Sequence, residues 1–177
     1  ISFLKLGNKS RDKNFAICSI TNNQIGDTTI MLTGIIPASW SGHLLSALRV
    51  MTGLLFLQHG TTKLLKFPAT EYFKDGVELF SFMGFTGALE IVGGVLIIIG
   101  LFTRVTAFIL AGMMAVAYFM AHASQGFFPI NNAGELAIMF CFAFLYLAAA
   151  GAGPWSVDAT RKLASSLSEG LIQIASR

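Results

Sequence analysis

Residues 80–101 read FSFMGFTGALEIVGGVLIIIGL, and this stretch decides the fold. Its only charged residue is Glu90. A helix needs about 20 mainly apolar residues to cross the hydrocarbon of a bilayer. A carboxylate at that depth costs at least about 2.5 kcal/mol and persists only beside a partner or a wet cavity. The stretch therefore predicts a membrane-spanning helix with a functional or structural site at Glu90.

The composition agrees with a membrane protein. Of the 177 residues, 54% are hydrophobic and only 12% are charged, whereas soluble domains carry about 25% charged residues. Much of the apolar surface should therefore face lipid, in a single domain. The net charge of +3 does not argue for nucleic acid, because the basic residues flank apolar runs and form no basic-aromatic patch.

Four apolar stretches predict four spans. Helices are expected, because a helix satisfies its own backbone hydrogen bonds in lipid. The tight turn at Gly100–Arg104 makes the second and third spans antiparallel neighbours. We expect an all-α, integral-membrane four-helix bundle with antiparallel up-down topology. The spans cover about residues 44–59, 80–101, 105–121 and 134–150.

Three segments flank or interrupt this bundle. Residues 1–40 are mostly polar and predict a flexible or non-native leader, with Met31 as a hypothetical biological start. Residues 41–158 form the membrane domain. Residues 63–79 mix charged and apolar side chains, which predicts an amphipathic surface segment after the first helix. Residues 159–177 predict an amphipathic C-terminal tail.

Small residues pattern the second span. Gly87, Gly93 and Gly94 allow neighbouring helices to approach closely where lipid gives no hydrophobic drive for association. We expect the second span to be the central helix of the bundle. The glycine-rich faces would also allow a homodimer.

Arg49 is the expected partner of Glu90. Each residue lies about ten positions from the loop that joins the first two spans. At about 1.5 Å per residue, both should lie about 15 Å from the same membrane face. Opposite charges at one depth should pair, either as a structural ion pair or as part of a substrate or proton site.

A polar cavity is expected on the loop side of this pair. His59 ends the first span, His122 ends the third and Glu135 opens the fourth, all on one side of the membrane. Such a group could hydrogen-bond a quinone, relay protons or bind a metal. Metal is disfavoured because no close-spaced ligand pair exists. Each histidine could instead be an interfacial side chain bonded to backbone or headgroups.

The two cysteines, Cys18 and Cys141, are far apart and form no C-x-x-C motif. A disulfide framework, a dithiol active site and a cysteine zinc site therefore lose support. Cys141 lies in an apolar run, as a small lipid-facing or core side chain does.

An ordered set of short motifs resembles the DoxX family of small four-helix bacterial inner-membrane proteins. The resemblance covers about residues 44–158. The motifs are Arg49, Gly53-Leu-Leu-Phe56, Gln58-His59-Gly60, Lys63, Glu90 with Gly93-Gly94, Gly100-Leu-Phe-Thr-Arg104, Gly134-Glu135, Gly151-Ala-Gly153-Pro154 and Ser156-Val-Asp158.

The resemblance implies a multi-pass protein of the bacterial inner membrane and adds Lys63 and Arg104 to the polar positions. It implies a component of a quinone-linked redox complex with a redox partner protein. No tightly bound cofactor is expected, and quinone is the candidate ligand. If the chain is an enzyme, it is a subunit of a quinone-linked oxidoreductase. The alternative is a non-enzymatic scaffold, an assembly subunit or a small-molecule passage. The Lys and Arg residues near the spans lead us to expect cytoplasmic termini.

Overall fold

The structure is a computed structural model, and it describes residues 37–175. The chain divides into two compact units, Ile1–Ser41 and Gly42–Arg177. Within the first unit, the described residues include one short 3-10 helix, η1 (Ala38–Trp40). The predicted leader lies almost entirely outside the described residues, as do Met31 and Cys18.

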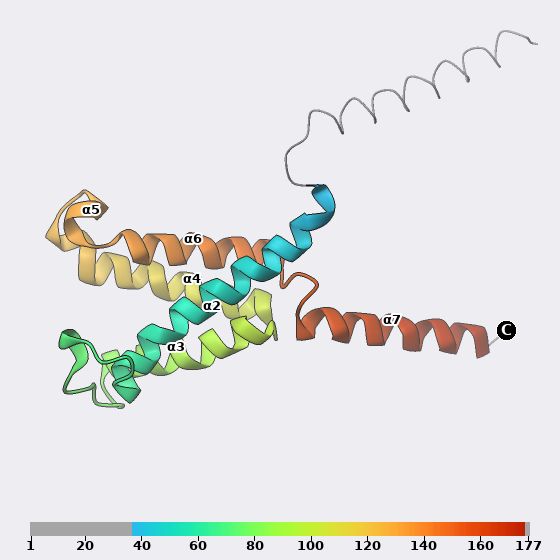
Figure 1. Cartoon of the computed structure of the whole chain (residues 1–177), viewed down its shortest axis with the longest axis horizontal. Helices are drawn as coiled ribbons and strands as arrows, with labels where there is room; N and C mark the ends of the chain where they lie inside the picture. The colour runs from blue at the N-terminus through green and yellow to red at the C-terminus, as the bar shows by residue number, and fades with distance from the viewer. Residues whose placement is uncertain (1–36, 176–177) are drawn as a thin grey trace, which may run out of the picture. The chain divides into compact units, whose positions relative to one another are not determined.

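Four apolar helices form the body of the protein (Figure 1): α2 (Ser41–Leu65), α3 (Phe82–Ile99), α4 (Thr103–Ala117) and α6 (Glu135–Ala150). Three apolar segments are long enough to cross a membrane, namely Ala38–Leu65, Phe82–Ile99 and Thr103–Gln125, while α6 is shorter. No strand occurs among residues 37–175. The prediction of an all-α membrane bundle is confirmed.

Shorter elements connect these helices. The segment after α2, expected to be amphipathic, is a largely irregular loop that contains one 3-10 helix, η2 (Glu71–Phe73). α4 continues into a π-helical turn, η3 (Tyr118–His122), and a 3-10 turn, η4 (Ala123–Gln125). The remaining helices are α5 (Pro129–Asn132) and α7 (Val157–Ala175).

Glycines allow α2 and α3 to pack closely. A Cβ atom on Gly60 would lie 2.7 Å from the carbonyl oxygen of Gly87, and one on Gly94 would lie 3.1 Å from Leu57. Residues later in α2 contact residues earlier in α3, so the two helices are antiparallel. Gly93 faces the other way, where its Cβ would lie 2.8 Å from Leu110 of α4. The glycine-rich helix α3 thus contacts helices on two sides.

An aromatic cluster joins α2 to α6. The ring of Phe56 lies 5.3 Å from that of Phe140 and 4.8 Å from that of Phe144, measured between centroids, both edge-on. Such aromatic pairs stabilise by about 0.5–1.5 kcal/mol beyond the burial of their area. Ile97 and Leu110 complete the same buried core from α3 and α4.

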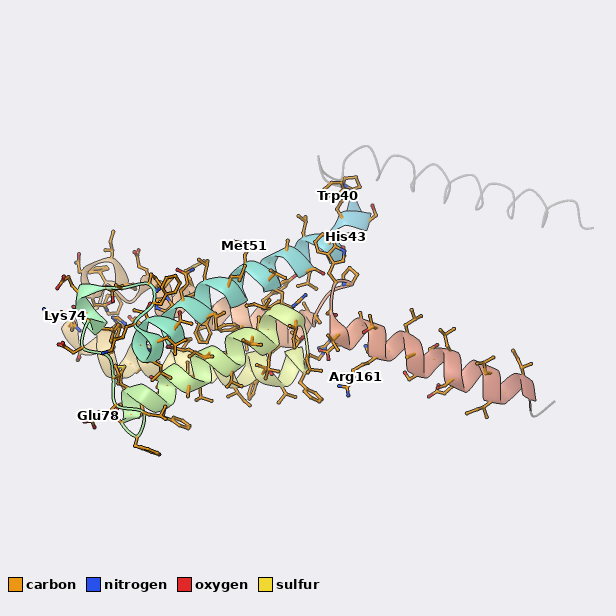
Figure 2. The ribbon with its side chains drawn as sticks, turned by 60° about the horizontal axis from the view of Figure 1, so that its bottom comes forward. Trp40, His43, Met51, Lys74, Glu78 and Arg161 are labelled. Atoms are coloured by element: carbon orange, nitrogen blue, oxygen red, sulfur yellow. The ribbon has the colours of Figure 1, made fainter. Side chains whose placement is uncertain are left out.

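The outward faces of the helices are apolar. Phe108 is 67% exposed, Met139 67% and Phe142 65%. Large apolar side chains on every outer face are expected where the solvent is lipid. The charged loop residues Lys74 and Glu78 lie at the end of the bundle opposite Arg161 (Figure 2). The protein is therefore a multi-pass membrane protein.

Candidate functional site

A cavity of about 360 Å³ opens between α2, α3, α4 and α6. We call it the Lys63–Glu90 cavity. Five polar side chains line it: His59, Lys63, Thr86, Glu90 and His122. The rest of the lining is mainly methionine and phenylalanine. These residues are Phe56, Phe73, Phe82, Met83, Met113, Met114, Met120 and Phe140.

An ion pair lies in the wall of this cavity. Lys63 Nζ donates to Glu90 Oε1 at 2.6 Å, and the two side chains are only 12% and 7% exposed. The other carboxylate oxygen, Oε2, is buried without a hydrogen-bond partner among the described residues. A buried carboxylate is tolerated when its charge is paired, and an unmet acceptor beside a cavity can receive a hydrogen bond from a ligand.

The expected pair between Arg49 and Glu90 is wrong. Arg49 is fully buried, and its Nε donates to the carbonyl oxygen of Ala152 at 2.8 Å. Its other guanidinium nitrogens donate to the carbonyl oxygens of Ile97, Ile98 and Trp155. Four carbonyls, two of them at the negative end of the α3 dipole, therefore stabilise this cation in place of a carboxylate.

The error came from the end of the first span. α2 continues past His59 to Leu65, which moves Arg49 about 9 Å further from the connecting loop at about 1.5 Å per residue. The same extension brings Lys63 opposite Glu90. The predicted span ends at residue 59, just before Gly60, because glycine commonly ends a helix. In the structure Gly60 lies inside α2 and packs against α3. Pro68 was the better stop signal, since proline cannot continue a helix.

The two histidines reach the cavity and Glu135 does not. The His59 ring lies 5.8 Å from that of Phe140, edge-on. His122 Nδ1 lies 2.8 Å from the carbonyl oxygen of Asn132. Glu135 is exposed at the first turn of α6, while its neighbours Leu136 and Ala137 line the cavity. An acidic side chain is favoured at that position by the helix dipole.

The contact with Asn132 fixes the hydrogen on His122. A carbonyl oxygen can only accept, so Nδ1 carries the proton and Nε2 of the neutral ring is an acceptor. Asn132 is itself buried, donating to Gly126 O and accepting from Gly134 N, both at 2.8 Å. We did not assign Asn132 this supporting role from the sequence, although its position in an uncharged loop beside Glu135 was a signal.

Metal coordination has little support from the geometry. Within residues 37–175, no group of three His, Cys, Asp or Glu side chains is placed to hold a metal ion. Cys141 is half-buried on α6. An apolar wall with a few convergent polar groups, as in this cavity, is typical of pockets for small organic molecules.

The sequence of this chain is similar to a family model and to two known proteins. The DoxX family model matches residues 44–123. An uncharacterized protein of Haemophilus influenzae is 44% identical over 119 residues, which are 66% of this chain and 89% of that protein. A Bacillus subtilis protein named "Putative oxidoreductase CatD" is 40% identical over 65 residues, 36% of this chain and 48% of that protein. No solved structure matches the chain.

The match to the family model includes most of α2 and all of α3 and α4, and hence Lys63, Glu90 and both cavity histidines. The Haemophilus relative extends the similarity over nearly its whole length. The chain therefore belongs to the DoxX family of membrane proteins.

Proposed function

We propose that the chain is a component of a quinone-linked redox complex in the bacterial inner membrane, and that the Lys63–Glu90 cavity is its quinone site. The observation that carries the proposal is the convergence of one ion pair and two histidines on an otherwise apolar cavity. Its volume of about 360 Å³ lies within the range of about 300–1,000 Å³ typical of small-molecule pockets.

The polar groups suit both forms of a quinone. Lys63 can donate a hydrogen bond to a quinone carbonyl. Glu90 Oε2 and His122 Nε2 can accept one from the hydroxyl of a reduced quinone. The phenylalanine and methionine side chains supply apolar contacts for the ring and its tail. A bound quinone would supply the two-electron chemistry, while these residues orient it and hold protons at its oxygens.

A partner protein should exchange electrons with that quinone. The sequence has two cysteines far apart and no C-x-x-C motif, which disfavours a dithiol active site in this chain. The Bacillus relative carries an oxidoreductase name, which favours a redox setting. We also propose that the termini lie in the cytoplasm. The compartment of the partner then determines which face of the bundle it contacts.

Organic extraction of the purified protein tests the proposal. We expect close to one quinone per chain, and His59→Ala or His122→Ala should weaken binding up to about tenfold, the value of one hydrogen bond. His43→Ala is the matched control, since His43 contacts Trp155 and does not line the cavity. Extraction of phospholipid without quinone, together with no binding of added quinone, would refute the site.

A non-enzymatic scaffold is the second candidate. Arg49, the most buried cation among the described residues, contacts only backbone carbonyls and serves packing. Under this alternative, the Lys63–Glu90 ion pair would likewise serve only helix packing. The observation that favours the quinone site is that this pair lines a cavity, whereas Arg49 does not.

A further inference from the structure

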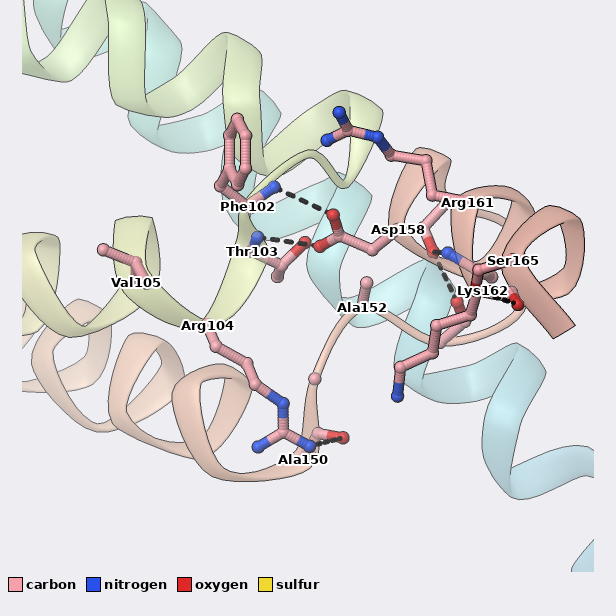
Figure 3. Close-up of a pocket in the computed structure, with 14 residues that line it drawn as sticks. Phe102, Thr103, Arg104, Val105, Ala150, Ala152, Asp158, Arg161, Lys162 and Ser165 are labelled. Carbon is pink, nitrogen blue, oxygen red and sulfur yellow. Dashed lines mark hydrogen bonds between the residues drawn. The ribbon is translucent and has the colours of Figure 1, made fainter. Parts of the chain in front are cut away.

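A second pocket lies at the other end of the bundle, where α3 ends, α4 begins and α6 ends (Figure 3). Its volume is about 560 Å³, and the first turns of α7 form one wall. Because apolar helices begin and end here, this pocket lies at the boundary between hydrocarbon and water. None of its lining residues lines the Lys63–Glu90 cavity.

The pocket carries an excess of positive charge. Arg104, Arg161 and Lys162 line it, against one carboxylate, Asp158. None of the three cations forms a salt bridge within the described part of the chain. Asp158 accepts from the backbone amides of Phe102 and Thr103, both at 2.9 Å.

Asp158 remains ionised at neutral pH. Partial burial acts to raise its pKa, but the hydrogen bonds from Thr103 and Phe102 and the charge of Arg161 outweigh burial and lower the pKa below its ordinary value. Because this carboxylate caps the start of α4, it leaves the cations available to an anion.

The three cations are held in different ways. Arg104 Nη1 donates to the carbonyl oxygens of Ala148 and Ala149, at 3.1 and 2.7 Å, and Nη2 donates to that of Ala150 at 3.5 Å, which leaves Nε and one hydrogen of Nη2 for a ligand. Arg161 lies 5.3 Å above the ring centroid of Phe102. Figure 3 shows Arg104 and Lys162 extending in the same direction on either side of the loop that carries Ala152.

Apolar surface borders these charges. Phe102 and Val105 line the pocket and are 58% and 64% exposed, as expected of lipid-facing side chains. α7 (Val157–Ala175) also carries a stripe of apolar side chains that is exposed in the described part of the chain. The stripe consists of Leu163, Leu167, Leu171 and Ile174, each between 61% and 74% exposed.

We propose that this pocket binds the phosphate headgroup of an anionic phospholipid. Cations next to exposed apolar side chains match the two parts of a lipid, whereas free phosphate would use the cations alone.

Native mass spectrometry of the whole protein in detergent tests the headgroup site. Offered equal phosphatidylglycerol and phosphatidylcholine, the protein should retain phosphatidylglycerol preferentially. Each cation near an anionic lipid contributes about fivefold in affinity, so the double variant Arg161→Gln/Lys162→Gln should lose about 25-fold of the preference. The matched control is Lys66→Gln/Lys74→Gln, which removes the same charge from residues that do not line the pocket.

Three results would overturn the headgroup site. The first is equal retention of the two lipids by the unaltered protein, which needs no variant to fold. The second is an unchanged preference in a folded double variant. The third is displacement of phosphatidylglycerol by inorganic phosphate at the same concentration, which would assign the pocket to a free anion.

Discussion

Arg49 and Lys63 are two buried cations on the same helix, and the protein uses them differently. Arg49 bonds four backbone carbonyls of α3 and of the loop after α6. Lys63, fourteen residues later, bonds one carboxylate beside a cavity. The planar fork of arginine is suited to several fixed acceptors, whereas lysine is a flexible point charge.

The contrast distinguishes the end of the bundle at Arg49, which we call the packing end, from the end that holds the Lys63–Glu90 cavity. The guanidinium of Arg49 is engaged by four acceptors within the chain, so it has little to offer a ligand. The Lys63–Glu90 pair leaves one carboxylate oxygen without a partner in the described residues and faces an apolar cavity. Four predictions test this difference, from the largest expected effect to the smallest.

Replacing Arg49 by methionine should cause the largest loss of stability, about 3–5 kcal/mol, because four carbonyls lose their donor in a dry site. Reversible unfolding in mixed micelles measures this. Arg49→Lys should recover less than half of the loss, since an ammonium cannot reproduce the fork. A folded Arg49→Met protein of unaltered stability would show that Arg49 does not hold the packing end together.

Glu90→Gln should destabilise the protein by about 2–4 kcal/mol, because it leaves the Lys63 ammonium buried without a counter-ion. Lys63→Met combined with Glu90→Leu should be closer to the unaltered protein than either single variant. The four unfolding free energies form a double-mutant cycle. Additive single effects would mean that the pair is not coupled.

Gly60→Ala should cost about 1–3 kcal/mol, because its Cβ would meet the Gly87 carbonyl at 2.7 Å. Gly112→Ala is the matched control, since a Cβ there has nothing within 4 Å. The control should be neutral or stabilise α4 by about 0.5–1 kcal/mol. Equal stability changes in the two variants would argue against close packing of α2 and α3.

Asp158 should give the smallest effect, visible only in acid. Its pKa is lowered in the folded protein, so it stabilises the start of α4 above its ordinary pKa of 3.8. That contribution is lost as the pH falls through the lower folded value. Trp155 fluorescence, in a Trp40→Phe background, reports unfolding at this end. Asp158→Asn should remove the acid-dependent component, and an identical pH profile in both proteins would contradict it.

Apolar run length was enough to predict the spans, because about 20 residues of low polarity have few alternatives to a membrane helix. The polar pairing was harder to predict. A glycine such as Gly60 can end a helix or allow two helices to pack closely, and the sequence does not distinguish the two. Ending the first span before Gly60 placed Arg49 nearly two helical turns too close to the connecting loop. His59 and His122 line the same cavity, and their positions near span ends on one side of the membrane were the signal for this. Glu135 was not, since its direction on α6 depends on the turn at Gly134.

The bonds of Arg49 also bear on biogenesis. Two of its acceptors, Ala152 and Trp155, are synthesised more than a hundred residues after Arg49 itself. The first helix thus enters the translocon with a cation whose full coordination does not yet exist. A chain that ended before residue 152 would lack two of the four carbonyls that hold this guanidinium.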